Sequence, residues 1–213
     1  TPNQEIVKNK FKKIKVQLPD TKYLLPLFYE KGDGYKGLLP DILKDLETII
    51  GVPFKITKTD GDINAYIIKN QRKMNDYIFS TPYYSSDIGI ANKKLDSYRA
   101  SISDLDNKKV LVVENSYFSE YLPHVAKDVI IVPVKSVQEG LKKLASGNGD
   151  YFVGFSSVIR GAITNEFLDD EVKIAGTINE NMAISLGVKK GDEELSQLVN
   201  TVMKSFAVDK TLT

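Results

Sequence analysis

The sequence predicts an α/β protein built as two units that are joined by a double crossover. The first half opens with a strand, an amphipathic helix and a second strand, and the second half alternates strands and helices from Val110 onward. Between the halves, Pro82 fixes its own φ and moves Thr81 out of the helical region. The stretch from Arg72 to Tyr84 is therefore predicted to be an extended crossover.

The first unit is expected to contain two helices and three strands. Thr1 can cap a short helix that has Pro2 at its first position and ends at about Lys10. A longer helix covers residues 38–50, because apolar residues recur there every three or four positions, and Gly51 ends it. Strands are expected at residues 14–18, 52–56 and 62–65. The last two are so close in sequence that no helix fits between them.

The second unit is expected to repeat the same alternation. Its strands are predicted at residues 110–113, 129–134 and 150–155, and its helices at residues 117–124 and from Val137 to the Gly147–Gly149 stop. A second crossover near residues 176–181 leads to a return strand at 183–188. An amphipathic helix with apolar residues from Leu195 to Phe206 then closes the first unit.

Composition excludes several classes of function. The 29 basic and 28 acidic residues balance, so no nucleic-acid or membrane-surface patch is indicated. The absence of cysteine rules out disulfides and thiolate metal sites. No apolar run is long enough to span a bilayer, and any targeting or anchoring segment is expected to lie outside this chain. We expect no cofactor, no metal and no nucleic-acid partner.

The central run, Arg72 followed by Phe79-Ser80-Thr81-Pro82-Tyr83 and then by residues 84–91, resembles the R…FS-PY signature of periplasmic solute-binding proteins of the amino-acid-binding type, family 3. Further matches follow in the expected order. They are Gly37 to Ile42, Gly51 to Phe54, the Ser103 to Val113 entry into the second unit, and the glycine-containing turn before Asp150.

The resemblance implies a two-lobe, periplasmic-binding-protein-like (type 2) Venus flytrap with a double-crossover hinge. Lobe 1 would consist of residues 1–86 plus 181–213, and lobe 2 of residues 87–180. In this family the ligand sits between the lobes, and its binding energy favours a closed state. One departure is the missing helix between the second and third strands, which implies a trimmed first lobe.

The resemblance also implies candidate ligand-binding residues. Arg72 corresponds to an arginine that forks onto the ligand carboxylate, although a solvated surface arginine beside Lys69 is the alternative. Asn115, Ser116 and Tyr117 stand at a helix N-terminus, where backbone N–H groups and the macrodipole favour an anion. Plain helix capping by Asn115 or Ser116 would explain them equally well.

Three more residues have two interpretations each. Tyr23 follows the first strand and either forms part of the wall of the ligand site or packs against other residues of the protein. Phe155 stands where amino-acid binders usually present an aspartate to the ligand ammonium group, so it either lines an altered site or belongs to the core. Ser156, or its neighbour Ser157, could supply a neutral hydrogen bond to the ligand in place of that carboxylate.

Two functions fit the predicted fold, and an enzyme is not expected because His124 has no recognisable catalytic partner. We favour an extracytoplasmic sensor domain of a membrane signalling protein, a histidine kinase or a cyclic-dinucleotide enzyme, that binds a small polar or anionic ligand. The Thr1-Pro2 opening resembles the lead-in of flytrap sensors, the chain stops soon after its last helix, and Lys69 and Phe155 depart from the transporter pattern. The alternative is the soluble substrate-binding protein of an amino-acid-type ABC importer, which would partner a membrane permease. Both place the chain in the periplasm.

Overall fold

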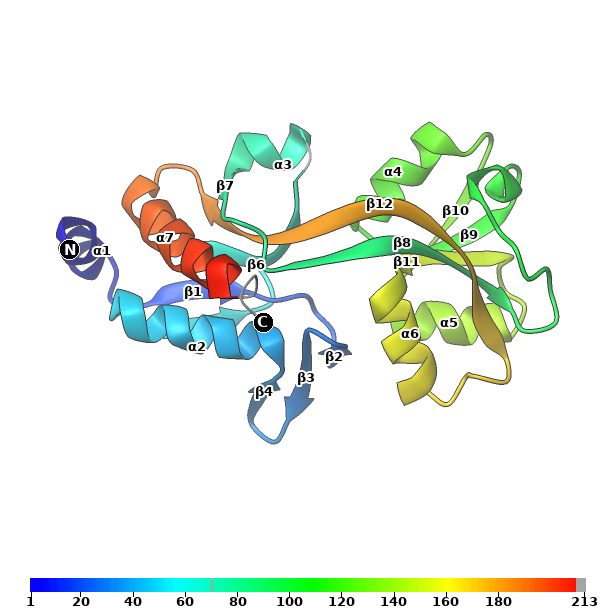
Figure 1. Ribbon diagram of the computed structural model, residues 1–213, viewed down its shortest axis with the longest axis horizontal. Helices are drawn as coiled ribbons and strands as arrows, with labels where there is room; N and C mark the ends of the chain where they lie inside the picture. Colours follow the sequence, from blue (N-terminus) through cyan, green and yellow to red (C-terminus); the bar gives the residue numbers. More distant parts are fainter. Residues whose placement is uncertain (70, 210–213) are drawn as a thin grey trace. The chain divides into compact units, whose positions relative to one another are not determined.

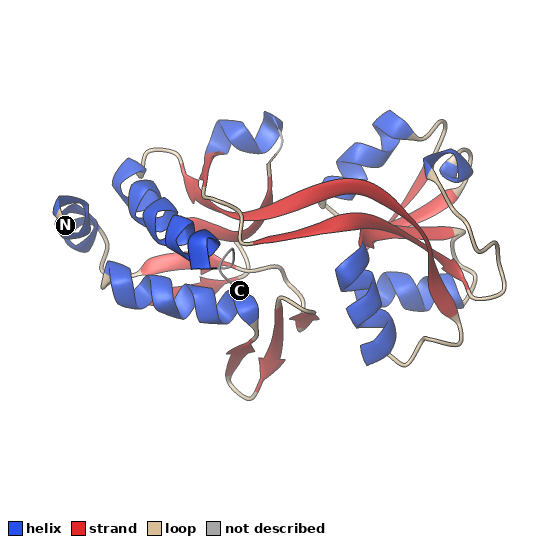
Figure 2. Ribbon diagram, viewed as in Figure 1, coloured by secondary structure: helices blue, strands red, loops and turns tan. Residues whose placement is uncertain are grey.

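The computed structural model describes residues 1–69 and 71–209, and Figures 1 and 2 show its helices and strands. The chain divides into two compact units. Unit 1 holds residues 1–22, 28–85 and 183–213, and unit 2 holds residues 23–27 and 86–182. The predicted lobe boundaries differ from these at each crossover by one or two residues, and they do not anticipate that Tyr23–Leu27 groups with unit 2.

Both crossovers of the chain run through long strands, as the predicted double crossover requires. β8 (Tyr84–Lys93) starts at the end of unit 1 and continues into unit 2. β12 (Val172–Lys189) starts in unit 2 and ends in unit 1. The structure places a single strand where the sequence predicted a crossover followed by a separate return strand, because no Pro or Gly interrupts residues 177–186.

Unit 1 combines a mixed sheet with helices. β1 (Ile14–Gln17) lies between β5 (Phe54–Thr57) and β6 (Ile63–Ile68) and is parallel to both. The last part of β12 pairs antiparallel with β6 and with β7 (Tyr77–Phe79). A two-residue turn at Gly32-Asp33 joins β3 (Phe28–Lys31) to β4 (Gly34–Lys36), and neither strand was predicted from the sequence.

The long helices of unit 1 form as their patterns predict. α2 (Leu38–Ile50) buries one apolar face and ends at Gly51, whose φ of 74° suits a residue without Cβ. α7 (Glu193–Asp209) buries Leu195, Val199 and Met203. α1 (Pro2–Lys10) begins with a capping box between Thr1 and Gln4. It is held to α7 by Asn3, which donates to Gln197 at 2.7 Å.

One prediction for unit 1 is wrong. The stretch after Arg72 is not extended throughout, because α3 (Gln71–Asp76) is helical and only then do β7 and β8 follow. The physical reason is that Pro82 restricts itself and Thr81, and its effect does not reach back to Asp76.

The connection between β5 and β6 has no helix, as the sequence predicted, and the strand register explains how this is possible. Thr57 pairs with Gln17 at the end of β5, while Ile63 pairs with Val16 at the start of β6. β6 therefore begins at the level where β5 ends, so the chain need not return to the opposite edge of the sheet. Gly61 makes the crossing over β1, and a Cβ there would lie 2.6 Å from the backbone nitrogen of Gln17.

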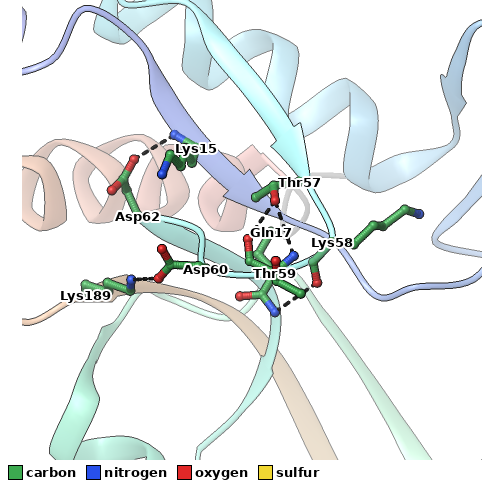
Figure 3. Close-up of polar contacts among 8 residues, drawn as sticks. All are labelled: Lys15, Gln17, Thr57, Lys58, Thr59, Asp60, Asp62 and Lys189. Carbon is green, nitrogen blue, oxygen red and sulfur yellow. Dashed lines mark hydrogen bonds and ion pairs between the residues drawn. The ribbon is translucent and has the colours of Figure 1, made fainter.

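Figure 3 shows how polar groups hold this crossing loop. Asp62 accepts a hydrogen bond from the backbone N–H of Lys15 at 2.7 Å, and Asp60 pairs with Lys189 at 2.5 Å. The register puts the side chains of Lys15, Gln17 and Asn64 on one face of the sheet, whereas the opposite face carries Ile14, Val16 and Ile63, which are fully buried. Because the face that carries Lys15, Gln17 and Asn64 is polar, it can remain in contact with solvent without a helix packed on it. The connection between β5 and β6, which contains no helix, agrees with this.

Unit 2 has a mixed sheet with helices at the ends of its parallel strands. β9 (Lys109–Val113) lies between β10 (Ile130–Val134) and β11 (Tyr151–Phe155) and is parallel to both, and β11 is antiparallel to β8. A short 3₁₀ turn (Ile102–Leu105) precedes β9. The helices are α4 (Tyr117–Val125), α5 (Val137–Ala145) and α6 (Ser156–Asn165), and β2 (Tyr23–Leu24) contacts α6. α6 was not predicted from the sequence.

Candidate functional site

One edge of the unit 2 sheet holds the candidate residues Asn115, Ser116, Tyr117, Phe155 and Ser156. β9 and β11 are parallel neighbours, so their carboxyl ends lie at the same edge. Three residues separate the end of β9 from the start of α4, and α6 begins directly after β11. The two helix starts are in contact, because the rings of Phe118 in α4 and Phe155 before α6 meet edge to face with centroids 5.2 Å apart. This edge therefore presents two helix N-termini together.

The start of α4 lacks the side-chain cap that its sequence suggests. Ser116 occupies the N-cap position, but its hydroxyl accepts no hydrogen bond from the first turn. The Ser116 Oγ is buried and has no hydrogen-bond partner within residues 1–69 and 71–209. In α5 of the same unit, by contrast, Ser136 accepts from the N–H of Glu139 at 3.2 Å. Helix capping thus accounts for Ser136 and does not account for Ser116.

Asn115 sets the direction of the chain into α4. Its φ of 56° lies in the left-handed region, which asparagine tolerates better than most residues. The N–H of Ser116 donates back to the carbonyl of Val113 at 3.2 Å, which closes a tight turn between β9 and the helix. Asn115 therefore shapes the turn that aims the first N–H groups of α4 beyond the end of the strand.

Two tyrosines of α4 stack on each other, and Glu180 of β12 contacts one of them. The rings of Tyr117 and Tyr121 stack with centroids 5.4 Å apart, and the Tyr121 hydroxyl donates to Glu180 of β12 at 3.2 Å. Burial, together with the neighbouring Glu180 carboxylate, raises the pKa of Tyr121 to about 12. The same two causes raise the pKa of Tyr117. Both phenols are therefore neutral donors at physiological pH.

A cluster of three serines caps α6. The hydroxyl of Ser86, in β8, accepts hydrogen bonds from the backbone N–H of Ser157 at 3.3 Å and from its hydroxyl at 3.0 Å. The Ser156 and Ser86 hydroxyls are 3.3 Å apart. Ser86 thus supplies the cap that the sequence of α6 lacks, and Ser156 lies at the helix start, where its contact with a ligand stays a prediction.

Phe155 lies in the core of unit 2. Only 2% of its surface is exposed, and its ring packs on Phe118. This placement leaves it almost no surface to offer a ligand. Its contact with Phe118 holds the start of α4 against the start of α6.

Tyr23 lies away from the two helix starts. Its hydroxyl donates to Glu166, at the far end of α6, and its carbonyl accepts from Gln138 of α5 at 3.1 Å. α6 rises about 1.5 Å per residue, so Glu166 lies roughly 15 Å from Ser156 along the helix axis. The structure does not bring Tyr23 together with Ser116 or Ser156.

Arg72 belongs to unit 1, where its backbone forms part of α3. Its side chain lies outside the part of the chain that the structure describes, so its contact with a ligand stays a prediction. Lys69 is exposed after β6.

Sequence reasoning missed Ser86, Tyr121 and Glu180. The spacing of Tyr117 and Tyr121 is four residues, which places them on one face of a helix and could have been recognised. Ser86 and Glu180 become neighbours of the other residues only through strand pairing. Within the described residues, no group of three His, Cys, Asp or Glu side chains is arranged to hold a metal ion, and no helix is long and apolar enough to span a membrane.

Comparison with solved structures identifies the fold. The arginine-bound form of truncated ArgBP from T. maritima matches with a TM-score of 0.81 at 18% identity, over 94% of this chain and 99% of that one. AbpA of Streptococcus pneumoniae, an amino acid ABC transporter substrate-binding protein bound to L-arginine, gives 0.82 at 21% identity, over 97% and 93%. No protein-family model and no curated protein matches the chain.

A domain of a different protein is about as similar. The VFT2 domain of BvgS from Bordetella pertussis matches with a TM-score of 0.80 at 19% identity, over 99% of this chain and 94% of that one. Together these matches show that the chain has the two-lobe, type 2 periplasmic-binding fold, as the sequence predicted.

Proposed function

We propose that this chain, a protein with the two-lobe periplasmic-binding fold, is an extracytoplasmic sensor domain that binds a small polar molecule. It would serve a membrane signalling protein, either a histidine kinase or a cyclic-dinucleotide enzyme. The observation that carries ligand binding is the uncapped start of α4, with the buried Ser116 hydroxyl, beside the Tyr117 and Tyr121 pair and Glu180. Arg72 remains the predicted contact from unit 1.

The charges at this edge favour a ligand that carries both signs. The first N–H groups of α4 and the helix dipole favour a carboxylate. The Glu180 carboxylate and the faces of two stacked tyrosines favour a cation. Phe155 offers no charge where amino-acid binders place an aspartate, and we infer that Glu180 supplies the countercharge for a ligand ammonium group instead. An amino acid meets these requirements, in keeping with the arginine held by two of the similar structures.

Two features favour the sensor over the importer. The lead-in helix α1 is folded onto unit 1, where Gln4 donates to the carbonyl of Ile49 at 2.6 Å and Lys10 pairs with Asp192. Lys69 and Phe155 both depart from the recognition pattern of amino-acid importers. The second candidate, a substrate-binding protein of an amino-acid ABC importer, is supported by the similarity to AbpA. In both cases the chain would work outside the cytoplasm.

The experiment is a thermal-shift screen of the purified chain against amino acids, small carboxylates, polyamines, purines and sugars. At a concentration about 100 times Kd, a ligand adds about 2.7 kcal/mol of stability. This corresponds to a rise in Tm of roughly 5 to 10 °C for a chain of this size. We expect an amino acid to give such a shift. If no compound of any class shifts Tm, the ligand-binding proposal fails.

Variants then locate the site. Glu180→Gln keeps the shape and can still accept from Tyr121, so we expect loss of the ligand shift with little change in the Tm of the free protein. Asp128→Asn, an exposed acid elsewhere in unit 2, is the matched control and should keep the shift. Arg72→Ala tests the predicted unit 1 contact. A full ligand shift in Glu180→Gln would remove Glu180 from the site.

A second measurement separates sensor from importer. Membranes that contain the full-length protein are assayed with and without the ligand found in the screen. Ligand-dependent phosphorylation or cyclic-dinucleotide synthesis supports the sensor. Uptake of the radiolabelled ligand, without either output, supports the importer.

A further inference from the structure

Unit 2 contains a pocket that none of the candidate site residues line. Its volume is about 490 Å³, and it lies between α6 and the start of β12. The residues that carry its chemistry are Lys94, Arg160, Thr164, Asp169 and Lys173. Ser86 stands near the start of β8 and Lys94 directly after its end, so the Lys94 end of the pocket is roughly 25 Å along the strand from the serine cluster.

The lining of this pocket has an excess of positive charge. Lys173 donates to the carbonyls of Lys93, Lys94 and Asp96 at 3.0, 2.6 and 2.6 Å, and Lys94 donates to the carbonyl of Asp169 at 2.7 Å. These carbonyls orient the two ammonium groups without neutralising them. Arg160 forms no ion pair within 4 Å among the described residues, and Asp169 is the one acid among the described lining residues. The pocket is therefore suited to a carboxylate, which the planar fork of an arginine recognises well.

Three large apolar side chains on the loops next to the pocket face solvent. We call them the rim: Leu95, Tyr98 and Phe167, which are 98%, 79% and 89% exposed, whereas other exposed large apolar residues in the described chain are at most 50% exposed. Each is tied to the pocket. Leu95 follows Lys94, the Tyr98 ring lies 4.4 Å from the Lys173 ammonium, and the N–H of Phe167 donates to the carbonyl of Thr164.

The two loops that carry the rim are held together. The N–H of Lys94 donates to the carbonyl of Glu171 at 2.8 Å, which joins the loop after β8 to the loop before β12, and Figure 1 shows both loops at the same end of unit 2. Phe167 is kept in the left-handed region, with φ of 56°, a costly conformation for a bulky residue. The fold thus holds an aromatic side chain in water at a cost in stability.

We propose that the pocket and the rim bind an extended segment of a partner protein that carries a carboxylate side chain between apolar residues. The carboxylate enters the pocket beside Arg160, and the apolar neighbours cover Leu95, Tyr98 and Phe167. Tyr, Phe and Arg are the residues enriched in the cores of protein interfaces. A free small anion would satisfy the pocket and would leave the rim exposed, so a peptide segment accounts for both features.

The experiment selects binding peptides from a random dodecapeptide phage library on the immobilised chain. We expect the enriched peptides to share an Asp or Glu flanked by apolar residues. A fluorescein-labelled peptide of that sequence is then titrated by fluorescence anisotropy. Arg160→Glu and Phe167→Ser should each weaken its binding at least about tenfold. Lys127→Glu and Ile130→Ser, at exposed positions elsewhere in unit 2, are the matched controls and should leave Kd unchanged.

Charge reversal and competition distinguish a peptide site from a general anion site. A peptide in which Lys replaces the acid should bind Arg160→Glu better than wild type, which also shows that this variant is folded. Inorganic phosphate and acetate should compete only weakly. The proposal is overturned if no peptide is enriched, if the enriched peptides lack an acid, if the two rim and pocket variants bind as wild type does, or if phosphate alone displaces the peptide at equal concentration.

Discussion

At the scale of single residues, the same residue type acts differently according to its contacts. Ser136 and Ser116 both stand at N-cap positions, but the Ser136 hydroxyl caps α5, whereas the Ser116 hydroxyl is buried without a partner in the described chain. Two phenylalanines in unit 2 differ as sharply, since Phe155 is buried and Phe167 is almost fully exposed. Sequence patterns treat the members of each pair alike, so their contacts decide the role of each residue.

The contrast between the phenylalanines predicts different effects on stability. Phe155→Ala removes a buried ring from its contact with Phe118, so the free energy of unfolding should fall by about 3 to 5 kcal/mol. Phe167→Ala removes an exposed ring and should change it by about 0.5 kcal/mol or less. Urea denaturation of both variants checks this. Equal losses in the two variants would contradict the assigned positions.

The raised pKa of Tyr121 predicts that the stability of the folded protein falls at high pH. Its pKa is raised to about 12 in the folded protein, above the ordinary value of 10. The folded state therefore holds the proton more tightly, and the stability that Tyr121 contributes is present below pH 10 and is lost as pH rises toward 12. An ultraviolet titration of wild type minus Tyr121→Phe should show one phenol that ionises well above pH 10. A difference spectrum with its midpoint at pH 10 would show that this phenol is not perturbed.

At the scale of elements, the strand register of unit 1 allows β5 and β6 to be joined without a helix between them. β6 starts where β5 ends, and the short loop crosses β1 at Gly61. The polar face of β1 can then stay uncovered. The sequence correctly indicated that no helix lies between β5 and β6, because the number of residues between two strands is visible in a sequence. The crossing over β1 was not visible, because it depends on the offset between strands.

Gly61 should therefore tolerate no side chain. A Cβ at this position would lie 2.6 Å from both the Gln17 nitrogen and the Ile63 carbonyl oxygen, and neither backbone atom can move without disturbing β1 or β6. Gly61→Ala should lower the free energy of unfolding by about 1 to 3 kcal/mol. Gly34→Ala is the control, because no heavy atom lies within 4 Å of its added Cβ. Similar melting temperatures for the two variants would refute the crossing geometry.

At the scale of the whole molecule, the chain passes between its units through strands rather than through loose linkers. β12 supplies residues to unit 2 and then pairs with β6 and β7 in unit 1. A strand shared in this way loses partners in both units when either unfolds. Cooperative unfolding of the two units is therefore expected.

This cooperativity can be measured because the sequence contains no tryptophan. Ile49→Trp in unit 1 and Ile130→Trp in unit 2 replace side chains that are about half exposed, and each provides a single fluorescent probe. The two variants should unfold at the same urea concentration. Midpoints that differ by more than about 0.5 M, with each m value well below that expected for the whole chain, would show that the units unfold separately.

The sequence by itself determined the fold class, the double crossover, most helices and strands, and the helix start at Asn115, Ser116 and Tyr117. These features follow from local patterns, since apolar periodicity, turn residues and strand spacing act within a few residues of each other. Only the tertiary structure decided that Ser86 caps α6, that Glu180 meets Tyr121, that Phe155 is core and that Tyr23 lies with α5 and α6. Each of these depends on contacts between residues far apart in sequence, which strand register and helix packing create and which no local pattern encodes.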